Sequence, residues 1–131
     1  MSLQLHRSPA ARGGSYSDAV VVDVAGARWI YVAGQTPRVT ARDAVPADVG
    51  GQAERCFRQI GSILARWDAS LADVVQITVY LTSLTDYGSF AAVRAQVFGS
   101  RPPASAAVGV ASLLDDALVE ISAVAVTTRE S

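Results

Sequence analysis

Apolar and polar residues alternate along several stretches of this chain in the patterns that predict strands. The runs Ala19 to Val24 and Arg28 to Ala33 are rich in β-branched and aromatic residues and flank a short turn at Gly26, which together predict a β-hairpin. Between Val74 and Leu81, apolar positions alternate with polar ones, as expected of a half-buried strand.

Two other stretches show helical spacing. From Val49 to Trp67, apolar residues recur every three or four positions, with polar residues such as Gln52 on the far side, which predicts an amphipathic helix of about five turns. Asp48 is its expected N-cap. A second helix is expected after residues 85–86, with a buried stripe between Phe90 and Phe98.

The C-terminal part predicts two more strands around a turn. Pro102 and Pro103 favour extended backbone, so a strand is expected to follow them. Its side chains alternate between a face expected to pack and an unusually small face. These faces are formed by Ala104, Ala106, Val108 and Val110, and by Ser105, Ala107, Gly109 and Ala111, respectively. The last run, Leu118 to Val126, is apolar except for Glu120 and Ser122, so a carboxylate stands inside a strand.

This order of elements predicts an α+β fold, in which two helices pack on one face of a sheet. A chain of 131 residues is expected to form a single domain, residues 1–131. Residues 1–15 have a polar and flexible composition and are expected to form an N-terminal arm without regular structure. The only histidine, His6, lies in this arm and is expected to be solvated.

Composition narrows the possible functions. The net charge is -1 without any run of like charge, which argues against a nucleic-acid surface. The apolar runs have only strand length and the N-terminus does not resemble a signal peptide, so we expect a soluble, cytoplasmic protein without membrane partners. The single cysteine, Cys56, excludes an intrachain disulfide, and its place on the apolar stripe of the first helix predicts core packing.

The residue types also restrict the chemistry. All 11 basic residues are arginine, so no lysine is available for a Schiff base. A lone histidine offers no histidine pair to hold a metal ion. We therefore expect neither a metal nor another cofactor.

Four short motifs, in order along the chain, carry a resemblance to a known family. They are Tyr16-Ser17-Asp18-Ala19-Val20, Gly34-Gln35-Thr36-Pro37, Leu84-Thr85-Asp86-Tyr87, and Pro103-Ala104 followed by Val108, Val110-Ala111 and Val119-Glu120-Ile121. In this order and spacing they resemble the RidA/YjgF family of reactive-intermediate deaminases. The resemblance implies a chorismate-mutase-like fold, a homotrimer, and small-molecule pockets between subunits. The absence of charge on the small strand face agrees with burial against other subunits.

The resemblance also implies roles for individual residues. Family members hydrolyse small enamines and imines, and by motif position Glu120 is the expected catalytic proton-transfer group. The expected substrate-binding residues are Tyr16, Gly34, Thr85, Ser105 and Ala107.

One departure from the family pattern concerns the substrate clamp. The family carries an arginine at the position of Ser105, often a cysteine at that of Ala107, and an asparagine at that of Thr85. Because an arginine fork binds carboxylate far better than a serine hydroxyl, Arg38 or Arg101 is a candidate replacement. Three function classes stay open: a diverged enamine or imine hydrolase, an enzyme of this fold with other hydrolase or lyase chemistry, and a trimeric ligand-binding protein without catalysis.

Overall fold

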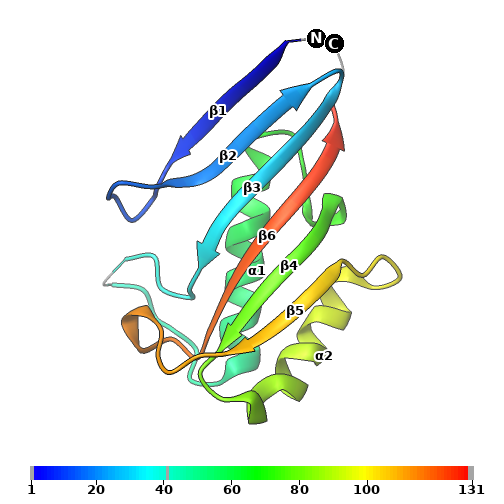
Figure 1. Cartoon of the computed structure of the whole chain (residues 1–131). Helices are drawn as coiled ribbons and strands as arrows, with labels where there is room; N and C mark the ends of the chain where they lie inside the picture. The colour runs from blue at the N-terminus through cyan, green and yellow to red at the C-terminus, as the bar shows by residue number, and fades with distance from the viewer. Residues whose placement is uncertain (1, 41, 130–131) are drawn as a thin grey trace.

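The computed structural model describes residues 2–40 and 42–129, in which six strands form one sheet. The strands are β1 (Leu3–Pro9), β2 (Ser17–Val24), β3 (Ala27–Gln35), β4 (Val74–Leu81), β5 (Ala104–Gly109) and β6 (Val119–Thr128). Their order across the sheet is β1-β2-β3-β6-β4-β5 (Figure 1). Only β4 and β5 pair in parallel; the other neighbours are antiparallel.

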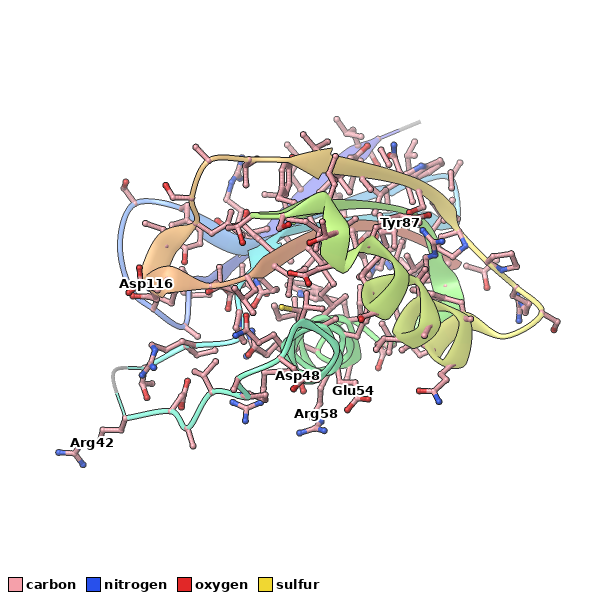
Figure 2. The ribbon with its side chains drawn as sticks, turned by 90° about the horizontal axis from the view of Figure 1, so that it is seen from below. Arg42, Asp48, Glu54, Arg58, Tyr87 and Asp116 are labelled. Carbon is pink, nitrogen blue, oxygen red and sulfur yellow. The ribbon has the colours of Figure 1, made fainter. Side chains whose placement is uncertain are left out.

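Two helices, α1 (Val49–Ala65) and α2 (Tyr87–Phe98), cover the same face of the sheet (Figure 2). Short 3-10 turns, η1 (Leu71–Asp73), η2 (Leu84–Asp86) and η3 (Leu114–Asp116), lie in the connections. The predicted α+β architecture, with both helices on one face, is therefore confirmed. No helix in the described part of the chain is both long enough and apolar enough to cross a membrane.

Local sequence explains where several elements begin and turn. The β2–β3 hairpin turns at Ala25 and Gly26, whose φ angles of 52° and 80° match the two-residue turn that suits strand twist. Asp48 caps α1 as predicted, because its side chain accepts a hydrogen bond from the Gly51 amide at 3.4 Å. α2 ends at Gly99, whose φ is 56°, a conformation that glycine adopts without strain.

The core lies between the sheet and the two helices. Phe57 of α1 stacks on Phe90 of α2 with ring centroids 6.2 Å apart, and Phe98 meets Phe57 edge-on at 5.4 Å. Cys56 is fully buried, as predicted; burial, with the charge of Glu120 as a further cause, raises the pKa of its thiol to about 12.

Gln52 is not on the exposed side of α1, where the pattern placed it. Its side chain is 5% exposed and bridges two loops, since it donates to the Pro46 carbonyl at 2.9 Å and accepts from the Leu118 amide at 2.8 Å. The NH₂ group and the carbonyl oxygen of the Gln52 side chain thus each have a hydrogen-bond partner, which permits the burial of this polar side chain.

The prediction of an unstructured N-terminal arm was wrong. Residues Leu3–Pro9 form β1, which pairs with β2 at the edge of the sheet. The strand was missed because its side chains are mostly polar and exposed, whereas backbone pairing with β2 does not depend on an apolar face. His6 is likewise not free in solvent: its Nε2 lies 3.1 Å from the Asp23 carboxylate, and its ring lies 5.5 Å from that of Trp67.

Asp23 is the centre of a buried charge cluster near this end of the sheet. Its carboxylate is 2% exposed and accepts two hydrogen bonds from Arg28, at 2.7 and 2.9 Å. Arg129 adds an ion pair at 3.5 Å. The hydrogen bonds from Arg28 hold the pKa of Asp23 below its ordinary value of 3.8, against the opposing effect of burial.

The second face of the sheet is left without a covering layer by the described chain, although it is rich in apolar side chains. Leu3, Leu5, Tyr31 and Val108 are 61%, 48%, 49% and 41% exposed, and the strand registers place all four on this open face, from one edge of the sheet to the other.

The face of β5 that was expected to pack does not do so. All six residues of the strand are exposed. Ser105 and Ala107 pair with the buried Ile77 and Val79, and so lie on the helix side. The face that was expected to pack belongs to the open side; its members within β5 are Ala104, Ala106 and Val108.

Candidate functional site

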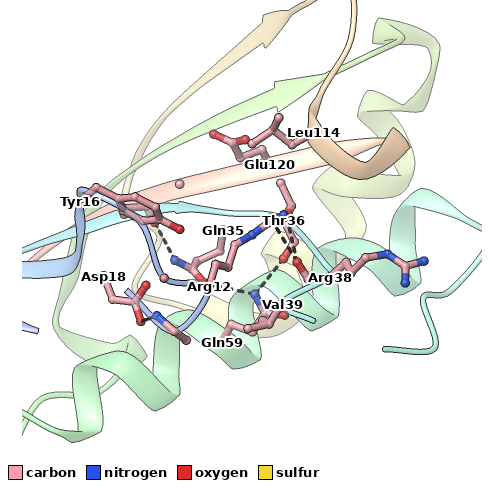
Figure 3. A pocket seen from close by; sticks show the side chains of 14 residues that line it. Arg12, Tyr16, Asp18, Gln35, Thr36, Arg38, Val39, Gln59, Leu114 and Glu120 are labelled. Atoms are coloured by element: carbon pink, nitrogen blue, oxygen red, sulfur yellow. Dashed lines mark hydrogen bonds between the residues drawn. The ribbon is translucent and has the colours of Figure 1, made fainter. Parts of the chain in front are cut away.

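A cavity of about 350 Å³ lies where β3 ends and β6 begins. The loop before β2, the loop after β3 and the η3 turn complete its walls (Figure 3). Its lining includes the polar side chains of Arg12, Tyr16, Gln35, Thr36, Arg38 and Glu120.

Glu120 enters the cavity from the open face of the sheet, directly over Gly34. A Cβ atom added at Gly34 would lie 2.9 Å from the Glu120 Cδ and closer still to Oε2, so no other residue fits without moving the carboxylate. The pairing of β3 with β6 is irregular between Val32 and Gln35, and this irregularity brings the Gly34 backbone beneath the acid. Glycine at this position therefore allows the carboxylate to lie close to the backbone.

The side chain of Glu120 is half-buried, and its carboxylate is not paired with another group of the described chain. Among the residues that the structure describes, it makes neither a hydrogen bond nor an ion pair. A carboxylate that faces a cavity and is not paired with its own chain can accept a proton from a bound molecule or from water.

The loop after β3 is fixed by α1. Gln59 donates to the side-chain oxygen of Gln35 at 3.2 Å and to the Thr36 carbonyl at 2.8 Å. Gln35 and Thr36 are both buried, at 9% and 5% exposure. The wall that carries Gly34 is therefore held in place by hydrogen bonds before any ligand binds.

Arg12 is a cavity residue that the sequence analysis missed. Its guanidinium donates to the Thr36 hydroxyl at 3.1 Å and to the Arg38 carbonyl at 3.3 Å. It also pairs with Asp115 of η3. The pair joins segments 103 positions apart in the chain. The only sequence signal was its place beside Gly13-Gly14, just before the first motif.

Tyr16 lies at the rim of the cavity and is 48% exposed. Behind it, buried Asp18 accepts a hydrogen bond from the Ala11 amide at 3.1 Å and lies 3.7 Å from Arg66. These contacts tie the loop that carries Tyr16 back onto β2 and α1.

The structure brings together only some of the predicted site residues. Glu120, Gly34 and Tyr16 line one cavity. Thr85, Ser105 and Ala107 lie outside it: Thr85 is in η2, where its hydroxyl lies 2.6 Å from that of Ser83.

Ser105 and Ala107 also lie on the other face of the sheet from Glu120. Glu120 pairs with Tyr80, which pairs with Val108 on the open side, whereas Ser105 and Ala107 alternate to the helix side. One chain therefore does not assemble the whole predicted set around one point.

The two candidate replacement arginines are separated as well. Arg38 lines the cavity and donates to the Asp43 carbonyl at 3.1 Å. Arg101 is exposed at the turn before β5 and is not among the cavity residues. No cluster of three or more potential metal ligands occurs among residues 2–40 and 42–129.

With the geometry established, comparisons place the chain among known proteins. Residues 6–127 match the family described as Endoribonuclease L-PSP. A RutC family protein of Pyrococcus abyssi is 39% identical over 113 residues, covering 86% of each chain.

A protein of Bos taurus named 2-iminobutanoate/2-iminopropanoate deaminase is 39% identical over 121 residues, covering 92% of this chain and 85% of the relative. The crystal structure of yeast Mmf1 superposes with a TM-score of 0.78 at 29% identity, covering 98% of this chain and 100% of the other.

Proposed function

The chain belongs to the Endoribonuclease L-PSP family, also known as YjgF/RidA, and from this premise we propose that it hydrolyses an enamine or imine, releasing ammonia. The observation that carries the proposal is the carboxylate of Glu120, which faces the cavity above Gly34 without a partner among the described residues. Relatives named as 2-iminobutanoate/2-iminopropanoate deaminases support this class of reaction.

The proposed reaction needs one group that moves protons. Water adds to the carbon of the C=N bond while Glu120 accepts the proton that the water loses, and the substrate nitrogen gains a proton. Collapse of the resulting amino alcohol forms the carbonyl and expels ammonia, so imine and water give oxo compound and ammonia. The hydroxyl of Tyr16 at the cavity rim serves as a hydrogen-bond donor to the charge that develops.

We further propose that the substrate is not 2-aminoacrylate or 2-iminopropionate. Ser105 offers one uncharged hydroxyl where the family resemblance expects the arginine that clamps the small carboxylate. The test generates imines from several amino acids with an amino-acid oxidase and follows their disappearance. Acceleration for a larger imine, with little for 2-iminopropionate, is expected. Turnover of 2-iminopropionate equal to that of an arginine-containing relative would contradict this choice of substrate.

Assembly is the third part of the proposal, because the site residues of one chain lie on different faces of the sheet. A homotrimer would cover the apolar open face and bring β5 of one copy toward the cavity of another. We expect light scattering at micromolar concentration to report three times the 13.7 kDa of a single chain. A mass of one chain would contradict the proposal.

Gly34→Ala tests the geometry beneath Glu120. The added Cβ would displace the carboxylate, and because small misplacements of a catalytic group are costly, kcat should fall by about a hundredfold. Gly88→Ala in α2 is the matched control, since nothing lies within 4 Å of the Cβ it would add. Equal kcat values for the two variants would show that the position of Glu120 is unimportant.

Two other functions can be tested by experiments on the same site. If the protein only binds a ligand, oxo acids should bind in the cavity while no imine is hydrolysed faster than in buffer. If the fold carries other hydrolase or lyase chemistry, Glu120 should remain essential for a substrate without a C=N bond. The net charge of -1 offers no support for the ribonuclease activity in the family's description.

A further inference from the structure

An arginine lies beside Ser105, although it comes from another element. Arg94 of α2 donates from Nη1 to the Ser105 hydroxyl at 3.0 Å. Its guanidinium therefore lies next to the strand position where the family resemblance expects an arginine side chain. Nothing in the spacing of α2 pointed to this contact, because it depends on how α2 packs beside β5.

The guanidinium of Arg94 is held in one orientation. Its Nη2 donates to the Tyr87 hydroxyl at 3.0 Å. Its carbon atom Cζ lies 5.5 Å from the centroid of the Tyr87 ring and 5.4 Å from that of Phe90. Contact with aromatic faces stabilises the cation, and the two hydroxyls define the direction of its planar fork.

The positive charge of Arg94 is also not neutralised locally. Within the described chain, no carboxylate lies within the 4.0 Å that defines an ion pair with its guanidinium. Arg12 and Arg28 differ in this respect, because each pairs with an aspartate. A half-buried guanidinium that is held in one orientation and is not paired with a carboxylate can bind an anion.

We infer that Arg94 and Ser105 together bind the acidic group of the substrate, in place of a single arginine on β5. This inference rests on the proposed imine hydrolysis and narrows its substrate to imines that carry a carboxylate but are larger than 2-iminopropionate. The Ser105 hydroxyl accepts from Arg94, so its own proton is available to the carboxylate. Arg94 has five N–H donors and uses one for each of its two hydroxyl partners, which leaves donors for the same anion.

The location also explains why the substrate should differ from that of relatives. The cation comes from α2 rather than from β5, and on this inference its donors hold the carboxylate at a different place from an arginine at position 105. In the proposed trimer, β5 of one copy and the Glu120 cavity of another would share one substrate.

Arg94→Gln is the direct test. For a carboxylate-bearing imine, kcat/KM is expected to fall by about 10- to 100-fold, the effect of losing charge-assisted hydrogen bonds. Arg94→Lys should recover only part of this loss, because it keeps the charge without the fork. Arg58→Gln is the control, since Arg58 is exposed on α1 (Figure 2) and makes no polar contact within the described chain. For an imine without a carboxylate, the fall in kcat/KM caused by Arg94→Gln should be smaller than for the carboxylate-bearing imine.

Calorimetry separates this inference from the proposed reaction. Wild-type protein should bind a 2-oxo acid, the product, about tenfold or more tightly than Arg94→Gln, whether or not imine hydrolysis is detected. Equal affinities, or absence of binding to wild type, would overturn the role of Arg94. Absence of imine hydrolysis with Arg94-dependent binding would instead overturn only the proposed reaction. Thermal unfolding of each variant reports whether the fold is retained.

Exchanging the two positions tests the same inference by gain of function. Arg94→Gln combined with Ser105→Arg transfers the guanidinium to β5, and should shift preference toward 2-iminopropionate. Ser105→Arg alone places two cations side by side, so it should yield a smaller gain than the exchange. A larger gain from the single variant would show that Arg94 does not occupy the anion position.

Discussion

Glu120→Gln is expected to lower kcat for imine hydrolysis by about 10²–10⁴-fold, the usual contribution of general acid–base catalysis. The substitution keeps the size and shape of the side chain but removes its ability to accept a proton. Because Glu120 makes no ion pair or hydrogen bond within the described chain, the folding of the chain should be unaffected.

The control for this variant is Glu54→Gln, an exposed glutamate on α1 (Figure 2). Single-turnover measurements of imine decay should show wild-type rates for Glu54→Gln and near-buffer rates for Glu120→Gln. If both variants retained full activity at an unchanged Tm, Glu120 would not be the proton-transfer group.

Asp23→Ala is expected to produce the largest loss of stability, about 3–5 kcal/mol, because it breaks a buried ion pair and leaves its cation behind. The carboxylate is 2% exposed and contacts Arg28, Arg129 and His6. Asp86→Ala provides the comparison, since Asp86 makes no side-chain hydrogen bond at the start of α2. Urea unfolding of both variants measures the difference; similar losses would contradict the importance of the cluster.

The charge cluster around Asp23 also predicts how the stability of the fold depends on pH. The pKa of Asp23 is lowered by its hydrogen bonds from Arg28, so the folded state favours the ionised form. This stabilisation is fully present above the ordinary pKa of 3.8 and disappears as pH falls through the lower folded pKa. Asp23→Ala should therefore lose less stability than wild type when the pH is lowered through this range.

Periodicity predicted the regular elements well where one face is buried. The hairpin, β4 and both helices were found because their apolar side chains repeat at strand or helix spacing. β1 was missed because an edge strand with exposed polar side chains has no such signal. The burial of Gln52 was missed because its partners, Pro46 and Leu118, are brought to it by the fold.

The candidate site, like the fold, was predicted only in part. The resemblance directed attention to Tyr16, Gly34 and Glu120, which the structure places around one cavity. Arg12 and Arg94 were not found, since each reaches its position through contacts between different elements of the fold. Spacing along a chain predicts which residues share a face, but not which side chain from a neighbouring helix reaches that face.

The most direct test is a crystal structure of the protein with a bound 2-oxo acid, the product of the proposed reaction. We predict electron density in the cavity beside Glu120 and Gly34, with the oxo group next to the Glu120 carboxylate. Density confined to the separate cavity lined by Arg28, Trp67 and Arg129, with the Glu120 cavity empty, would contradict the proposed site.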